Sequence, residues 1–321
     1  MRAVTLHDGH CGISECESPA PASDEVLIKT AYAGINRADL LQKQGKYPLP
    51  QKTPCIPGME LSGEIIACGT EVSGWKTGDR VCALVSEGAF AEYVAVPASH
   101  LLPVAEHISL EAAAALPEAC FTSWISLVWQ ARIAAHETLL IHGGTSGIGS
   151  IAVQIACILG ARVFTTSGTD EKCTLCETLG AEKAINYRKD DFVARVKTLT
   201  KNNGVDIILD MVGGDYFGRN LECLSQDGRL CIIAFQKGAK AEVNLAPVLL
   251  KHLSVMGSTL RSRPSHEKAQ IAAELKQNIW DFVEKGAIKP VIDHVFPLAQ
   301  AEKALLRMEE GLNVGKILLK I

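Results

Sequence analysis

A glycine-rich turn in the middle of the chain most constrains its fold. The apolar residues Leu139, Leu140 and Ile141 lead into the turn GGTSGIG at 143–149, and residues 149–159 have the apolar spacing of a helix. Free backbone N–H groups at a helix start bind a pyrophosphate, and glycine lets the backbone approach it closely. A purely structural turn is the alternative, but strand, turn, helix and second strand follow at dinucleotide-fold spacing. The turn therefore predicts a nucleotide cofactor site.

Short apolar strands alternate with helical segments from residue 123 to residue 258. Such alternation is typical of a doubly wound parallel sheet. We expect strands at residues 138–142, 161–166, 184–186, 205–210, 229–234 and 253–257, with helices at 149–159, 173–179, 192–200 and 216–224.

The flanking segments have a different pattern. Roughly the first 120 residues hold short strands separated by glycine turns, among them 25–30 and 90–96, which is typical of an antiparallel, barrel-like domain. After residue 258 we expect a helix at 265–285, a strand at 292–296, a helix at 299–308 and a strand at 316–320. A length of 321 residues suits two domains.

Composition excludes several classes of protein. The net charge is −4, without the basic excess of a dedicated nucleic-acid binder. No apolar run approaches the roughly 18 residues of a membrane span, and the N-terminus lacks the apolar core of a signal peptide. We expect a cytoplasmic protein with no membrane partner. Among the 11 scattered cysteines only Cys173 and Cys176 are close, and we interpret them as packed or surface thiols.

The end of the second predicted strand separates the two nicotinamide cofactors. An NAD site usually has an acidic residue there for the ribose hydroxyls, whereas this chain has Thr-Ser-Gly-Thr at 166–169. Lys172 and Tyr187 follow, and a cation, small hydroxyls and a phenol suit a 2′-phosphate. Asp170 and Glu171 favour NAD instead, unless they only cap the helix. We expect NADPH.

Several short motifs, read together, resemble one protein family. They are NRADL (36–40), QGKY (44–47), GMELSG (58–63), GDRV (78–81), GAFAEY (88–93) and NVGK (313–316). With the glycine turn, the chain resembles the medium-chain dehydrogenase/reductase superfamily. Within it, the sequence is similar to the zeta-crystallin-like quinone oxidoreductase branch of the tumour-suppressor-inducible type. The similarity runs essentially from end to end.

The resemblance implies a mixed α/β architecture of two domains. A GroES-like β-barrel catalytic domain would comprise residues 1–122 completed by 259–321. A Rossmann domain with a doubly wound parallel sheet would comprise residues 123–258 and bind NADPH. Such proteins usually form homodimers through the edge strands of the Rossmann sheet, and the apolar segment 245–260 offers one.

The resemblance also implies roles for individual residues. Asn36 and Tyr47 would lie near the nicotinamide and are the candidate catalytic residues. The matched pyrophosphate residues are Ser146, Gly147 and Ile148. The matched adenosine phosphate residues are Gly168, Lys172 and Tyr187. The other residues matched to the cofactor cleft are Gly213, Gly214, Phe235, Ser258, Thr259, Leu260 and Asn313. Local departures from the family pattern occur at His142, Ser146 and the loop 235–237.

No metal is expected. Zinc-dependent relatives place a Cys where this chain has Asn36, a His where it has Met59, and a third thiolate near Glu118. Asn, Met and Glu are not the Cys/His set that zinc prefers. The four-cysteine structural lobe of those relatives is missing, because residues 80–93 are too few to contain it.

The implied activity is NADPH-dependent, zinc-independent reduction of quinones by hydride transfer from the nicotinamide. A quinone is already electron-poor and needs no Lewis acid. Tyr47 is the best candidate for contacting the acceptor or donating a proton, and Asn36 would orient the nicotinamide or the acceptor. The alternative for Tyr47 is a loop tyrosine that packs beside Pro48 and Pro50.

Two other functions stay open. An enone or enoyl-thioester reductase would use the same cofactor on a different electron-poor acceptor. A cofactor-binding protein with an RNA-binding role is the other, although nucleic acid is the less favoured partner. Its sequence support is the most basic stretch of the chain, which contains Lys251, His252, Arg261, Arg263, His266 and Lys268.

Four charged or polar residues are interpreted as structural. Asp39 and Arg80 are expected to form an ion pair with each other. Glu60 is expected to be a buried, hydrogen-bonded carboxylate. His142, at a strand end beside the glycine turn, is expected to be a packed or capping residue.

Overall fold

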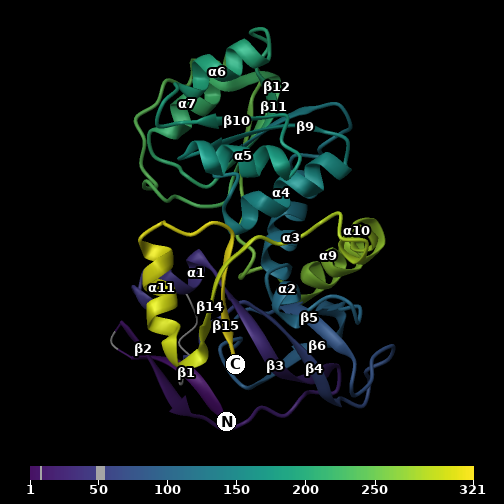
Figure 1. Cartoon of the computed structure of the whole chain (residues 1–321). Coiled ribbons are helices and arrows are strands. Elements are labelled where there is room, and N and C mark those ends of the chain that lie inside the picture. The colour runs from purple at the N-terminus through teal and green to yellow at the C-terminus, as the bar shows by residue number, and fades with distance from the viewer. Residues whose placement is uncertain (8, 48–54) are drawn as a thin grey trace. The chain divides into compact units, whose positions relative to one another are not determined.

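The computed structural model divides the chain into two units (Figure 1). The first unit comprises Met1–Phe121 and Arg261–Ile321, so the two ends of the chain fold together, and the second comprises Thr122–Leu260. The structure describes residues 1–7, 9–47 and 55–321. Within these ranges no helix combines the length and the apolar character that a membrane crossing requires.

The second unit contains a six-stranded parallel sheet in the order β10-β9-β8-β11-β12-β13. The predicted doubly wound sheet is confirmed. Its strands are β8 (Thr138–His142), β9 (Arg162–Ser167), β10 (Lys183–Asn186), β11 (Val205–Asp210), β12 (Leu224–Ile232) and β13 (Ser254–Gly257). Its helices are α4 (Gly147–Ile158), α5 (Asp170–Thr178), α6 (Phe192–Leu199), α7 (Tyr216–Cys223) and α8 (Ala246–Leu250). The chain enters this unit through α3 (Pro117–Trp124) and a π-helical segment, Ile125–Gln130.

Alternating side chains of the central strands build two apolar cores. Leu139 and Ile141 of β8 belong to a cluster that includes Ala152 of α4. Leu140, which points to the other face because side chains alternate along a strand, belongs to a cluster that includes Phe192 of α6. Both faces of the sheet are therefore buried, as a parallel sheet requires.

The first unit is built around a mixed sheet in the order β14-β15-β3-β4-β5-β7, and β6 pairs with β3. The expected GroES-like unit is thereby confirmed, in addition to the Rossmann-like sheet. Its strands are β1 (Arg2–His7), β2 (His10–Glu15), β3 (Glu25–Ile35), β4 (Glu60–Cys68), β5 (Arg80–Leu84), β6 (Tyr93–Pro97), β7 (Leu101–Pro103), β14 (Ile292–Pro297) and β15 (Lys316–Lys320). Its helices are α1 (Arg37–Lys43), α2 (Leu110–Ala114), α9 (Ser265–Asn278), α10 (Trp280–Glu284) and α11 (Ala301–Glu309). Short 3-10 turns lie at Ala98–His100 and Leu298–Gln300.

Among the predicted elements whose bounds differ in the structure, two have a visible cause. The helix expected at 265–285 is broken at Ile279, whose φ of −130° is not helical, so that α9 and α10 are separate. Ile279 is fully buried, and the indole N–H of Trp280 donates to the carbonyl of Pro103 at 2.8 Å. The strand expected at 25–30 continues to Ile35, because its second half pairs with both β4 and β15.

Candidate functional site

The carboxyl ends of the parallel strands bring together the segments that the sequence analysis assigned to the cofactor. In a doubly wound sheet ligands bind outside these ends, next to the point where the strand order reverses, here between β8 and β11. The assigned residues follow the strands one by one: Ser146, Gly147 and Ile148 after β8, Gly168 and Lys172 after β9, Tyr187 after β10, Gly213 and Gly214 after β11, Phe235 after β12, and Ser258, Thr259 and Leu260 after β13.

The glycine turn presents a helix start suited to an anion. Ser146 is the N-cap of α4, and its hydroxyl oxygen accepts from the Gly149 N–H at 2.9 Å. Gly147 and Ile148 are the first two helical residues, so their N–H groups have no carbonyl partner within the helix. A Cβ on Gly149 would lie 2.2 Å from the carbonyl oxygen of Gly143, so only glycine fits there. The Ser146 hydroxyl thus shapes the turn, and the free N–H groups are those of its neighbours.

A buried polar network fixes the strand ends beneath this turn. The Asp210 carboxylate accepts from Asn220 Nδ2 at 3.1 Å, which turns the Asn220 carbonyl oxygen toward His142 Nε2 at 2.7 Å. Nε2 must then carry the proton, and Nδ1 accepts from the Thr166 hydroxyl at 3.0 Å. Burial lowers the pKa of His142 and keeps its ring neutral. The packed role expected for His142 is therefore confirmed.

The same carboxylate orders the glycine pair after β11. Asp210 accepts from the backbone N–H of Val212 at 2.7 Å and of Gly213 at 3.3 Å. Gly213 and Gly214 have φ values of +66° and +56°, in the left-handed region that favours glycine. A Cβ on Gly213 would lie 2.9 Å from the ring of Phe235, whose side chain is otherwise 53% exposed.

Gly168 and Tyr187 meet at the end assigned to the adenosine phosphate. A Cβ on Gly168 would lie 2.9 Å from the Tyr187 hydroxyl, and it would lie 3.5 Å from Nε of Arg188. Lys172 lies in the first turn of α5, where its N–H donates to Thr169 Oγ1 at 3.2 Å. Arg188 is a cation that the sequence analysis did not single out, although its position directly after Tyr187 was a signal for it.

Asp170, one of the two acidic residues that favoured NAD, already has partners. Its carboxylate accepts from Asn186 Nδ2 at 2.7 Å and pairs with the ammonium of Lys189. The hydrogen bond from Lys189 is the main reason why the pKa of Asp170 is lowered. Because Lys189 partly neutralises the Asp170 carboxylate, this carboxylate repels a phosphate at the tip of β9 less than the sequence suggested.

In the first unit, Asn36 belongs to a buried network around Glu60. Asn36 Nδ2 donates to Glu60 Oε1 at 2.9 Å and more weakly to the carbonyl of Gly34, while its Oδ1 accepts from Lys316 Nζ at 2.6 Å. Glu60 also pairs with Lys316 and accepts from the Glu118 N–H at 2.9 Å. Burial opposes the charge on Lys316, but the carboxylates of Glu60, Glu118 and Asp39 together outweigh it, and the pKa of Lys316 is raised. The expected buried, bonded carboxylate at Glu60 is confirmed.

Tyr47 lies under a guanidinium that is itself anchored. Arg261 is centred 4.7 Å from the Tyr47 ring, pairs with Asp39 at 3.0 Å and donates to Gln42 Oε1 at 2.9 Å. Burial raises the pKa of Tyr47 and Arg261 partly offsets this, so the phenol is protonated at neutral pH. Tyr47 is therefore positioned with its proton in place. Pro48 and Pro50, the expected packing partners, lie outside the described residues.

The expected ion pair between Asp39 and Arg80 is wrong. Asp39 pairs with Arg261, whereas Arg80 donates to the carbonyls of Ala105, Glu106 and Ile108. Arg80 begins β5 and faces the loop after β7, with which β5 pairs. Asn313 lies in the turn before β15, where its side-chain amide donates to the carbonyl of Gly315 at 2.9 Å.

The positions that carry zinc ligands in other dehydrogenases hold a different chemistry here. Asn36 is committed to Glu60 and Lys316, Met59 is buried, and burial raises the pKa of the Cys120 thiol. Across residues 1–7, 9–47 and 55–321, no three His, Cys, Asp or Glu side chains are grouped as metal ligands. The buried cation beside Asn36 is the ammonium of Lys316.

The basic stretch near residue 260 does not form a free cationic surface. Lys251 donates to the carbonyls that end α7, at Leu221, Glu222 and Leu224. In the other unit Arg261 pairs with Asp39, Arg263 pairs with Glu267, and Lys268 donates to Ser86 and to the Arg261 carbonyl. The lysine and arginine side chains of the basic stretch, on which the RNA-binding hypothesis rested, therefore make contacts within the protein.

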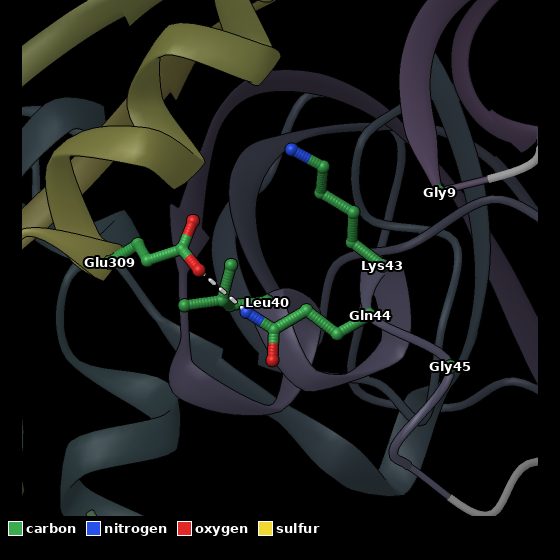
Figure 2. A pocket seen from close by; sticks show the side chains of 6 residues that line it. All are labelled: Gly9, Leu40, Lys43, Gln44, Gly45 and Glu309. Atoms are coloured by element: carbon green, nitrogen blue, oxygen red, sulfur yellow. Dashed lines mark hydrogen bonds between the residues drawn. The ribbon is translucent and has the colours of Figure 1, made fainter.

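A pocket of about 360 Å³ in the first unit is lined by none of the predicted site residues. Figure 2 shows its lining, in which the Gln44 amide donates to Glu309 at 2.8 Å, and Lys43 pairs with Glu302 outside the lining. The lining residues are Gly9, Leu40, Lys43, Gln44, Gly45 and Glu309. None of them was assigned to cofactor or acceptor, and its polar groups are already paired.

Comparisons with known proteins agree on the family. Residues 22–106 match the alcohol dehydrogenase GroES-like domain, and residues 147–277 match the domain described as zinc-binding dehydrogenase. The chain is 33% identical over 306 residues to quinone oxidoreductase-like protein 2 of Bos taurus, covering 95% of this chain and 87% of the relative.

Solved structures share the whole fold. Quinone oxidoreductase of Escherichia coli complexed with NADPH is 28% identical, with a TM-score of 0.90 and complete coverage of both chains. An NAD-dependent alcohol dehydrogenase is 29% identical, with a TM-score of 0.90 and complete coverage of both. The CurK enoyl reductase is 25% identical, with a TM-score of 0.88 over 99% of this chain and 98% of that one.

The buried pair of Arg261 and Asp39 predicts a pH-dependent loss of stability. We expect Arg261→Gln to lower the free energy of unfolding at pH 7.5 by about 3–5 kcal/mol, because it leaves the Asp39 carboxylate buried without a counter-charge. Burial already raises the pKa of Asp39 from 3.8 to about 6, against the opposing effect of Arg261. Below that value Asp39 is protonated in the folded protein, so the loss should shrink at pH 5.

Urea unfolding at the two pH values measures this difference. Arg80→Gln is the matched control, since Arg80 donates only to carbonyls and its loss should not change with pH. An equal loss for Arg261→Gln at pH 5 and pH 7.5 would contradict the role given to Asp39.

Proposed function

Because the chain belongs to the quinone oxidoreductase-like proteins of the medium-chain dehydrogenase/reductase superfamily, we propose that it reduces quinones with NADPH and without zinc. It is an oxidoreductase of that superfamily; the acceptor and the choice of NADPH are the proposal. The observation that carries the proposal is the end of β9, where Gly168 lies against the Tyr187 hydroxyl and Asp170 is held by Lys189 and Asn186.

The residues of the second unit fit a dinucleotide. The N–H groups of Gly147 and Ile148 would hold the pyrophosphate at the start of α4. Gly168, lacking a side chain, lets the Tyr187 hydroxyl approach its backbone closely, where that hydroxyl would contact the phosphorylated ribose. Bound NADPH supplies the hydride, and the protein's contribution is to position it and to shape the acceptor site.

The residues of the first unit divide the remaining work. Tyr47 carries a phenolic proton that it can donate to the reduced acceptor oxygen. Both amide hydrogens of Asn36 point to Glu60 and Gly34, so Asn36 offers only its oxygen as a further acceptor. A quinone has only hydrogen-bond acceptors, so it cannot donate to the Asn36 oxygen, whereas the nicotinamide amide can. Of the two roles expected for Asn36, orientation of the nicotinamide is therefore the one that fits.

An enoyl reductase remains the second candidate. It is favoured by the likeness to the CurK enoyl reductase and by Tyr47, because reducing an enoyl thioester also ends in a proton transfer.

The first test is the initial rate of NADPH oxidation with a simple ortho-quinone on EDTA-dialysed protein. We expect turnover with NADPH that dialysis does not reduce, and little turnover with NADH. Turnover only with an enoyl thioester would replace quinone reduction by the second candidate. Loss of activity on dialysis that zinc restores would refute the metal-free mechanism.

Removing the phenol should slow turnover. We expect Tyr47→Phe to lower kcat about 10- to 100-fold, because the reduced oxygen must take its proton from water, while the Kd of NADPH is unchanged. Tyr93→Phe, in β6 of the same unit, is the matched control and should keep the wild-type kcat. An unchanged kcat for Tyr47→Phe would leave Tyr47 as a packing residue.

The edge of the Rossmann sheet supports the expected homodimer. β13 is an edge strand with Val255 42% exposed, and the helix before it exposes Leu249 and Leu250 by 77% and 72%. An apolar edge of this kind favours pairing with a second copy.

Light scattering should therefore give twice the monomer mass of 34.4 kDa. We expect the double variant Leu249→Asp, Leu250→Asp to be monomeric and Leu306→Asp, an exposed leucine of the first unit, to stay dimeric. A monomeric wild-type protein would refute the dimer.

A further inference from the structure

The loop after β10 holds Arg188 beside Gly168. The Tyr187 N–H donates to the carbonyl of Ser167 at 3.1 Å, and the Arg188 N–H donates to Asn186 Oδ1 at 3.1 Å. These two backbone bonds tie the loop to the ends of β9 and β10. Nε of Arg188 consequently lies 3.5 Å from the point that a Gly168 Cβ would occupy, next to the Tyr187 hydroxyl.

Arg188 differs from the neighbouring lysine in having no counter-charge. Lys189 pairs with Asp170, which neutralises both. In the part of the chain that the structure describes, the Arg188 guanidinium makes no hydrogen bond or ion pair, and the residue is exposed. Gly168 adds no side chain in front of it. An exposed guanidinium without a counter-charge therefore lies at the tip of β9.

We propose that Arg188 determines the preference for NADPH by binding the 2′-phosphate, with the Tyr187 hydroxyl as a second donor. This rests on the proposed NADPH-dependent function. A guanidinium presents several N–H donors in a plane and binds a phosphate in bidentate fashion. NADH carries a hydroxyl at this place and gains little from the charge. Arg188 therefore discriminates between the two cofactors, a role that the sequence analysis gave to Lys172.

The test is calorimetric binding of NADPH, NADH and 2′,5′-ADP to the full-length protein. We expect Arg188→Gln to weaken NADPH and 2′,5′-ADP about 10- to 100-fold, the size of a lost charge-assisted contact, and to change NADH binding less than about twofold. Arg188→Lys keeps the charge without the planar donors and should fall between the two.

Two further variants separate the possible outcomes. Arg195→Gln removes a half-buried arginine of α6 that pairs with Asp190, and this variant should bind all three compounds as the wild type does; a matching loss there would reduce the effect to net charge. If the wild type binds NADH as tightly as NADPH, the proposed cofactor choice fails. A third outcome is that the wild type prefers NADPH, that Arg188→Gln keeps this preference and that Lys172→Gln loses it. In that case the inference about Arg188 fails while the proposed function stands.

Discussion

The fully buried carboxylate of Asp210 organises the second unit. A buried charge without partners is costly, and Asp210 is satisfied by the N–H groups of Val212 and Gly213 and by the Asn220 amide. Two of these donors lie in the turn after β11, and the third is a residue of α7. The hydrogen bonds to one carboxylate therefore set the shape of the turn. Through Asn220 and His142 the constraint reaches the end of β9, at Thr166. The strand ends that carry the proposed cofactor residues are thus fixed relative to one another.

Buried ion pairs have the equivalent role in the first unit. Glu60 with Lys316, and Asp39 with Arg261, join residues of the first third of the chain to residues of its last fifth. Removing one member would leave the other charge buried without a counter-charge, which is strongly destabilising. Each pair therefore holds the two ends of the chain in a single unit. The same pairs fix the Asn36 amide and the Tyr47 ring. Stability and the proposed chemistry of this unit therefore depend on the same contacts.

The local features of this site could be predicted from the sequence, whereas its distant partners could not. The glycine turn, the alternating strands and Gly168 are features of short segments, and the structure contains them as expected. Arg261 is 222 residues from Asp39 and Lys316 is 280 residues from Asn36, separations over which no local pattern indicates a contact. The mistaken pairing of Asp39 with Arg80 has this cause. The helix break at Ile279 likewise involves a distant residue, since the indole of the adjacent Trp280 donates to Pro103 at the end of β7.

Burial suppresses the reactivity of several of the cysteines. All 11 are free, and a thiolate is the form that adds to a quinone. Burial raises the pKa of Cys173 to about 11 and those of Cys223 and Cys231 to about 12, which keeps these thiols protonated at neutral pH. Cys176 lies under the glycine turn, with its Sγ 2.7 Å from where a Gly144 Cβ would be, and its thiol pKa is raised as well. The close pair of cysteines thus packs α5 against the sheet, and the same burial keeps both thiols in the protonated form, which is the less reactive one.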